Sequence, residues 1–436
     1  MHRVLNVAEA RERARRVLPR GMFEFIDRGT EDEHGLSETR RMLAATRLRP
    51  AVLVDVDGRS QETELLGRRQ PMPLVVAPTG LAGLMWYRGE VELARAAARA
   101  DIPFCVSTQS ITCVEEIAAK AGGRIWFQLY ILKDRELSES FVQRAQDTGC
   151  EALIVTVDTA VSPKREYNTH NGFGIPFQPN LRGAIDLSLH PRWVFGVLGR
   201  YVLDGGIPSF PHYPPEFHRK ITRAALDERL RLADDVTWDE IAALRRRWPR
   251  KLVIKGILRA DDAKRAAAIG ADAIVVSNHG GRNLDAAITP VEALPEIVDA
   301  VGSSLTVLAD SGVQRGSDVI KLLALGARGV LVGRSMLFGT ERPARVRRDQ
   351  AAGARRAQRA RGAFDAVRHR RRGRGRRKPR PRYIARRDGP HHGLHRLQDD
   401  RRHPPGLRAH GARSGPLKHN HRRSRPWTSD WTAARP

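Results

Sequence analysis

The feature that most constrains this 436-residue chain is an alternation of short apolar runs with helix-period segments between residues 74 and 333. The runs are rich in Val, Ile and Leu, which favour buried strands. They lie at Leu74–Ala77, Phe104–Ser107, Ile125–Tyr130, Ala152–Asp158, Leu252–Gly256, Ala273–Asn278, Leu305–Asp310 and Gly329–Gly333. Continuous apolar strands separated by helices indicate a parallel sheet whose outer face is covered by helices.

The segments between these runs have the spacing of amphipathic helices. We predict helices at Gly89–Ala100, Cys113–Ala121, Asp134–Thr148, Thr237–Trp248, Arg259–Ile269, Pro290–Ala300 and Gly316–Leu325. Thr237 precedes Glu240 at the spacing of a capping box. Eight such units predict a closed (β/α)8 barrel, an α/β fold with its active site at the carboxyl ends of the strands. A doubly wound open sheet is the alternative, but no GxGxxG follows the first strand.

The chain divides into three predicted regions. Residues 1–70 are expected to form an N-terminal helical extension that caps the barrel, and residues 71–340 the barrel itself. Within the barrel, residues 159–236 form a long connection after the fourth strand, and such loops are usually functional. The stretch His190–Leu203 mixes aromatic and aliphatic residues with Arg. It fits either an interfacial membrane helix or a lid that packs on the barrel mouth.

The third region, residues 341–436, is a basic tail. It holds 30 Lys and Arg against 7 Asp and Glu, which is +23 of the formal charge of +27. Its mixture of Arg, Gly, Pro, Ala and His buries too little apolar surface to offset chain entropy. Three interpretations of this tail are open: a nucleic-acid-binding arm, a disordered extension, or out-of-frame translation of a GC-rich gene. We favour the third, because the composition changes inside a structural unit, and we therefore do not expect nucleic acid to be the partner.

Several classes of protein are excluded by composition. No apolar run approaches the ~20 residues of a membrane-spanning helix, and the charged N-terminus lacks the apolar core of a signal peptide. Cys105, Cys113 and Cys150 are too few for a disulfide framework, which predicts a cytoplasmic protein. No Cys/His cluster has zinc spacing, so we expect no metal site.

Polar residues gather where the predicted strands end. In the run Ser277–Arg282 (SNHGGR), glycines beside His279 allow a ligand to approach closely, and Arg282 offers a fork for a carboxylate. Lys255 ends the fifth strand and needs an anionic partner, for which a flavin N1–C2=O edge and a metal-bound phosphate are the alternatives. The glycine-rich ends of the last two strands, DSGVQRG and VGRS, lie where barrels commonly bind phosphate.

Taken together, these stretches resemble one known family. The matching segments are LPRGMFEFIDRGTEDE, LVVAPTG, IWFQLYILKDR, ALIVTVDTAVSPKRE, LVIKGI, IVVSNHGGRNLD, LADSGVQRGSDVIKLLALGA and VLVGR, in order from about residue 5 to residue 339. The chain resembles the FMN-dependent α-hydroxy acid dehydrogenases and oxidases, which include glycolate oxidases, L-lactate dehydrogenases and mandelate dehydrogenases. The resemblance implies oxidation of an L-2-hydroxy acid, lactate-like in size, to the 2-oxo acid, with oxygen, a quinone or a cytochrome as electron acceptor. It also implies a homotetramer and a peripheral contact with the inner face of the membrane.

The resemblance assigns a role to each candidate residue. FMN would lie across the barrel mouth, with its phosphate on Asp310, Ser311, Gly312, Gly333 and Arg334 and with Lys255 at its N1/O2 edge. The isoalloxazine would be lined by Ala77, Pro78, Thr79, Ser107, Gln128, Thr156 and Ser277. His279 would be the general base, and Asp158 would stabilise its imidazolium form. Tyr130, Arg165 and Arg282 would hold the substrate carboxylate and hydroxyl.

The chain departs from the family pattern at four places. Phe25 replaces a Tyr that contacts the substrate carboxylate, Gln109 replaces the Trp of glycolate oxidase, and Gln314 replaces an Arg that helps hold the FMN phosphate. We therefore expect weaker carboxylate binding or a different substrate, a changed pocket wall, and Arg334 as the main phosphate cation. Beyond Thr340 the last barrel helix lacks core-facing residues, although 351–363 could form a poor helix. A catalytically defective flavoprotein is therefore the alternative function.

Overall fold

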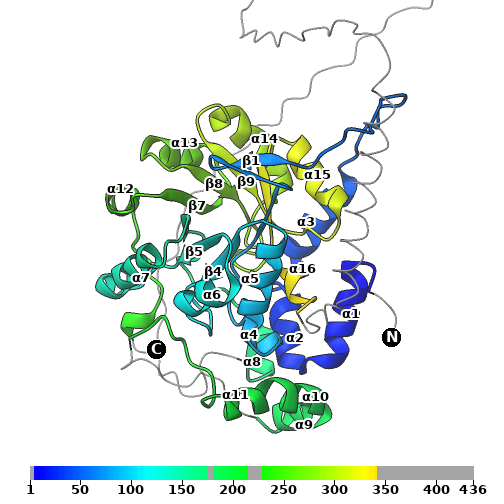
Figure 1. Ribbon diagram of the computed structural model, residues 1–436, viewed down its shortest axis with the longest axis vertical. Coiled ribbons are helices and arrows are strands. Elements are labelled where there is room, and N and C mark those ends of the chain that lie inside the picture. The colour runs from blue at the N-terminus through cyan, green and yellow to red at the C-terminus, as the bar shows by residue number, and fades with distance from the viewer. Residues whose placement is uncertain (1–3, 174–179, 215–227, 341–436) are drawn as a thin grey trace, which may run out of the picture. The chain divides into compact units, whose positions relative to one another are not determined.

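A computed structural model describes residues 4–173, 180–214 and 228–340 (Figure 1). The chain divides into two units, Met1–Arg348 and Asp349–Pro436. The second unit and the predicted basic tail lie outside the described residues, so the three interpretations of the tail stay predictions. Among the described residues, none of the helices combines the length and the apolar composition that a membrane-spanning helix requires.

Eight parallel strands close into a barrel, which confirms the predicted fold. The strands are β3 (Leu74–Val76), β4 (Phe104–Ser107), β5 (Ile125–Leu129), β6 (Ala152–Thr156), β7 (Lys251–Ile257), β8 (Ala273–Val276), β9 (Thr306–Ala309) and β10 (Gly329–Val332). They pair in chain order, and β10 closes the barrel against β3. The register pairs Ser107 with Gln128 and Thr156 with Lys255. Polar side chains from neighbouring strand ends therefore lie beside one another at the mouth.

Helices surround the barrel because each strand is followed by a segment with one apolar face (Figure 1). They are α5 (Gly89–Arg99), α6 (Val114–Ala121), α7 (Arg135–Asp147), α12 (Trp238–Arg247), α13 (Ala260–Ala268), α14 (Pro290–Val301) and α15 (Gly316–Ala324). Two short helices, α4 (Ala82–Met85) and α16 (Arg334–Leu337), follow β3 and β10. Thr237 caps α12 by accepting a hydrogen bond from the backbone of Glu240, as its spacing predicts.

The N-terminal segment contributes three helices and a hairpin. The helices are α1 (Val7–Val17), α2 (Arg20–Asp27) and α3 (His34–Ala45), and the hairpin pairs β1 (Thr63–Leu65) with β2 (Arg68–Gln70). The sequence pattern does not predict this hairpin, because three-residue strands are too short to show a period. Leu65 is fully buried and packs with the side chains that fill the barrel interior. A domain boundary at residue 70 stays a prediction.

The long connection after β6 contains short helices rather than only a loop. They are α8 (Glu166–His170), α9 (Leu181–Leu189), α10 (Pro191–Trp193), the π-helical turn η1 (Val194–Leu198), α11 (Gly199–Leu203) and the 3-10 turn η3 (Glu228–Leu230). One face of this cluster packs on α4, where the Trp193 indole donates to the carbonyl of Leu84 at 2.7 Å. Figure 1 shows α9–α11 at the opposite end of the barrel from the β1–β2 hairpin.

Candidate active site

A cavity of about 380 Å³ lies at the carboxyl ends of the strands. Sixteen of the predicted site residues line it: Ala77, Pro78, Thr79, Ser107, Gln128, Tyr130, Thr156, Arg165, Lys255, His279, Arg282, Asp310, Ser311, Gly312, Gly333 and Arg334. Asp158 and Ser277 do not line it. Asp158 contacts the cavity through His279, and Ser277 is fully buried behind the wall.

His279 is held in one orientation by its neighbours. Its Nδ1–H donates to both carboxylate oxygens of Asp158, at 2.9 and 3.0 Å, which leaves Nε2 as the unprotonated nitrogen. The Tyr130 hydroxyl lies 3.5 Å from Nε2. His279 has a φ of 57°, and its backbone N–H donates to the Ser277 hydroxyl at 3.0 Å. Although left-handed backbone is unfavourable for a non-glycine residue, it turns this side chain into the cavity directly after β8.

Burial and charge set the protonation states of the pair. Burial lowers the pKa of His279 below its ordinary value, and the attraction of Asp158 only partly opposes this effect. Burial alone would raise the pKa of Asp158, but the pull of His279 and Lys255 brings it below its usual value. At neutral pH the imidazole is therefore uncharged and the carboxylate ionised. Asp158 can come this close to β7 because Gly256 has no Cβ, which would lie 2.6 Å from the Asp158 Cβ.

Lys255 is a buried cation held between two acidic groups. Its Nζ lies 3.3 Å from Asp310 and donates to the Ser277 hydroxyl at 3.0 Å. Burial would lower the pKa of Lys255, but the attraction of Asp310 and Asp158 raises it above its ordinary value. The ammonium therefore stays charged while it faces the cavity. Ser277, expected against the isoalloxazine, instead fixes the Lys255 ammonium and the His279 backbone.

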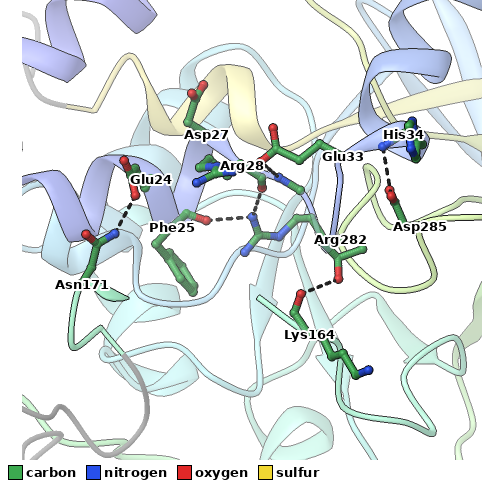
Figure 2. A network of polar contacts seen from close by, with 12 residues as sticks. Glu24, Phe25, Asp27, Arg28, Glu33, His34, Lys164, Asn171, Arg282 and Asp285 are labelled. Carbon is green, nitrogen blue, oxygen red and sulfur yellow. Dashed lines mark hydrogen bonds and ion pairs between the residues drawn. The ribbon is translucent and has the colours of Figure 1, made fainter. Parts of the chain in front are cut away.

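Two arginines place positive charge in the same cavity as His279. Arg165 donates to the backbone carbonyl of Arg282 at 3.0 Å. Arg282 in turn donates to the carbonyls of Phe25 and Arg28, at 2.7 and 2.9 Å (Figure 2). Neither guanidinium has a carboxylate partner within the described ranges. Burial and the adjacent Arg282 lower the pKa of Arg165 to about 10. A bound anion would relieve this repulsion, so the pair is suited to a carboxylate.

The second helix of the N-terminal segment supplies part of this wall. The Arg282 guanidinium lies over the Phe25 ring, 5.1 Å from its centroid, and the centroid of the Phe173 ring lies 5.3 Å from that of Phe25. Figure 2 shows how α2 and the start of α3 are fastened to the barrel loops, including His34 to Asp285 at 3.0 Å and Asn171 to Glu24 at 2.6 Å. Phe25, Gln109 and Gln314 all line the cavity, so three of the four departures lie in its wall.

Unpartnered polar atoms test whether the cavity suits FMN. Gln128 Nε2, Thr156 Oγ1 and Arg334 Nε are buried and have no hydrogen-bond partner among the residues that the structure describes. Buried polar groups in proteins are normally paired. A flavin ring offers carbonyl and nitrogen atoms to the first two, and a phosphate would accept from the third. Burial, together with Arg282, lowers the pKa of Arg334 to about 10, so this guanidinium also favours an anion. The residues present therefore fit FMN.

Sequence reasoning missed some residues of this cavity. Arg11, Asp27 and Arg40 line it, and all three come from the N-terminal helices. No strand-end pattern marks them, because their position depends on how these helices dock on the barrel.

Comparisons with known proteins decide the family. The family model described as FMN-dependent dehydrogenase matches residues 14–348. This chain belongs to the FMN-dependent dehydrogenases. The predicted resemblance and the FMN cofactor are thereby confirmed.

The relatives of this FMN-dependent dehydrogenase are similar over most of their length. An (S)-mandelate dehydrogenase of Pseudomonas putida is 40% identical over 336 residues, 77% of this chain and 84% of the relative. An L-lactate dehydrogenase of Pseudomonas syringae pv. syringae (strain B728a) is 41% identical over 343 residues, 77% of this chain and 87% of the relative. A crystal structure described as monotopic membrane protein (S)-mandelate dehydrogenase has a TM-score of 0.73 and 40% identity. It covers 78% of this chain and 89% of that one.

Proposed function

We propose that this enzyme oxidises an L-2-hydroxy acid to the 2-oxo acid, with His279 as the general base. The observation that carries the proposal is the uncharged imidazole of His279, which is held by the ionised Asp158 and faces the same cavity as Arg165 and Arg282. Oxidation at the α-carbon requires a base near the hydroxyl and cations near the carboxylate. Both are brought together at one end of the barrel. The mandelate and lactate named in the relatives are 2-hydroxy acids of this kind.

Each side chain has a role in this proposal. Arg165 and Arg282 bind the substrate carboxylate, and the Tyr130 hydroxyl orients the substrate hydroxyl toward His279 Nε2. His279 then accepts the hydroxyl proton, and Asp158 stabilises the resulting imidazolium. Burial and the charge of Asp158 raise the pKa of Tyr130 to about 12, so its hydroxyl stays protonated and able to donate.

The same proposal assigns the cofactor contacts. When bound, FMN supplies the acceptor for the two electrons removed from the substrate. Ala77, Pro78, Thr79, Ser107, Gln128 and Thr156 would hold its ring, and Lys255 its N1/O2 edge. Asp310, Ser311, Gly312, Gly333 and Arg334 would hold its phosphate. Ser277 would act through Lys255 rather than by contact.

Anaerobic spectroscopy tests this function. The purified chain is expected to carry a flavin whose visible absorption bleaches on addition of L-lactate or (S)-mandelate, with one equivalent of 2-oxo acid formed per flavin. The D-lactate control should leave the spectrum unchanged. A flavin that no L-2-hydroxy acid bleaches would contradict the catalytic proposal. That outcome would support the alternative of a defective flavoprotein whose C-terminal region is damaged. Re-oxidation with oxygen, a quinone or cytochrome c then identifies the electron acceptor.

A second proposal concerns the membrane. We propose that α9–α11 contact the cytoplasmic face of a membrane peripherally. Large apolar side chains are exposed there: Leu181, Ile185, Leu189, Phe195, Val202 and Leu203. Leu203 is 90% exposed although the opposite face of the same segment packs on the barrel. Contiguous exposed apolar surface commonly marks an interaction site. The similar solved structure is described as a monotopic membrane protein.

Vesicle sedimentation tests the membrane proposal. The chain should sediment with phospholipid vesicles, and the double variant Phe195→Asp/Leu203→Asp should stay in the supernatant. Leu53→Asp, which alters an exposed apolar residue elsewhere, is the matched control and should sediment like the unaltered chain. Equal sedimentation of all three proteins would contradict this proposal.

Light scattering of the lipid-free enzyme tests the expected homotetramer.

A further inference from the structure

The end of the cavity proposed for the FMN phosphate has few available cations. Ser311 and Gly312 have φ of 78° and 73°, which shapes the loop after β9 around this end. Gln314, in the same loop, lines the cavity but is uncharged. Arg334 is buried here and donates to the carbonyl of Gly280 at 2.9 Å. A phosphate monoester carries close to two negative charges at neutral pH, so one guanidinium leaves it partly uncompensated.

Helix α3 packs directly against this loop. A Cβ on Gly312 would lie 2.8 Å from Thr39 Cγ2 and 3.0 Å from Leu43 Cδ1, so only glycine permits the approach. Arg40 lies between these two residues on α3, and its Cδ is 3.7 Å from the same point. The packing therefore places the Arg40 side chain over the loop.

The Arg40 guanidinium has N–H groups at this position that are not used in hydrogen bonds to the described residues. Its Nη1 donates to the carbonyl of Gly312 and lies 3.2 Å from Asp318. Its Nε and Nη2 have no partner in the described ranges, and the side chain lines the cavity. Asp318 in turn accepts from the backbone N–H groups of Gln314 and Arg315, both at 3.0 Å. Arg40 is thus fixed at one nitrogen while the others remain available to a ligand.

The other arginine of the N-terminal helices that lines the cavity is already engaged. Arg11 forms a two-bond pair with Asp27, at 2.5 and 2.6 Å. Such a bidentate pair satisfies both charges and leaves little attraction for a further anion.

We propose that Arg40 supplies the second cation of the FMN phosphate site. This inference rests on the proposed placement of the phosphate at Ser311, Gly312, Gly333 and Arg334. The N-terminal helices thereby contribute directly to cofactor binding, and they discriminate FMN from riboflavin, which lacks the phosphate.

The test compares the affinities of flavin-stripped full-length chain for FMN and for riboflavin, by quenching of flavin fluorescence. Arg40→Met removes the charge and keeps the side-chain length. It should raise the Kd for FMN by about tenfold to a hundredfold, the range of a charge-assisted hydrogen bond, and leave the Kd for riboflavin unchanged. Arg41→Met is the matched control. Its residue is adjacent on α3, exposed and paired with Glu38 at 2.6 Å, and neither Kd should change.

A second pair of variants separates charge from packing. Arg40→Lys should recover part of the lost FMN affinity, and Arg40→Met/Gln314→Arg should recover it by restoring a cation at the same end. An equal weakening of FMN and riboflavin binding, or no weakening, would overturn the inference. If Arg40→Met does not fold, the variants Arg40→Lys and Gln314→Arg decide the test. The inference is overturned if neither of these two variants changes the ratio of the Kd for FMN to the Kd for riboflavin. If the unaltered chain binds neither flavin, the proposed function fails too. If it binds both equally, only the phosphate placement and this inference fail.

Discussion

The two carboxylate oxygens of Asp158 both accept from Nδ1 of His279, at 2.9 and 3.0 Å, and this contact fixes which imidazole nitrogen is free to act as a base. The residues come from different strand ends, β6 and β8, and meet only because the barrel closes. Because His279 must be unprotonated to act as a base, the reaction rate should depend on pH through this pair.

Asp158→Asn should change the pH profile as well as the rate. Burial lowers the pKa of His279, so the base is unprotonated above a pKa that lies below the ordinary value of about 6.5. The kcat/KM should therefore rise with pH through that pKa and be level near neutrality. Because Asp158 raises the pKa of His279, its removal should move this acid limb to lower pH. The maximal rate should fall by about 10²-fold or more, since the imidazolium loses its partner. An unmoved acid limb in the variant would contradict the coupling.

Phe25→Tyr should tighten substrate binding. The ring of Phe25 lies under Arg282, so a hydroxyl added to it can reach a carboxylate held by that arginine. One hydrogen bond of about 0.5–1.5 kcal/mol corresponds to a KM for L-lactate lower by about twofold to tenfold. Steady-state kinetics measure the effect, with the unfolding midpoint as a control for general damage. A raised or unchanged KM would show that the carboxylate binds elsewhere.

Gln109→Ala should shift the preference toward bulky substrates. Gln109 lines the cavity beside Gly80, where a Cβ would lie 3.3 Å from the Gln109 Cβ. Removing the side chain enlarges the wall, so the ratio of kcat/KM for (S)-mandelate to that for L-lactate should rise by about tenfold, the effect of a small change in pocket size. A ratio that does not change would mean that Gln109 lies outside the substrate pocket.

Lys255→Met should cost stability even without flavin. The substitution leaves Asp310 buried and unpaired, and breaking a buried pair commonly costs about 3–5 kcal/mol. Lys251→Met removes an exposed ion pair with Asp272 on the same strand, and it should cost at most about 1 kcal/mol. Urea unfolding of the two flavin-free variants gives the comparison. Equal losses of unfolding free energy would contradict the burial argument.

The sequence could predict the barrel because buried parallel strands appear as continuous apolar runs. Each of the eight runs contains or overlaps a strand, and the polar residues that follow them line the mouth. The predicted strand ends differ from the observed ones by a residue or two. Tyr130 and Asp158, for example, lie just beyond the ends of β5 and β6. Such positions depend on hydrogen bonds between strands, which no single-strand pattern specifies.

Other parts of the site depend on tertiary packing. Arg40 lies on a helix far from the strands in sequence, and only the docking of α3 on Gly312 places it in the cavity. Ser277 has the expected position at the end of β8, but its side chain points toward Lys255 rather than the cavity. The out-of-frame origin of residues 341–436 stays a prediction. Resequencing the gene around codon 340 would test it, because a corrected frame should restore an amphipathic final helix.

The rate of anaerobic flavin reduction in His279→Gln tests the central claim most directly. The variant should bind FMN with an unchanged spectrum, because the His279 ring donates to Asp158, and the backbone bond from His279 to Ser277 is kept in the variant. Reduction by a saturating L-2-hydroxy acid should slow by about 10²-fold to 10⁴-fold, the contribution of a positioned base. A flavin-loaded variant reduced as fast as the unaltered enzyme would contradict the assignment of His279 as the base.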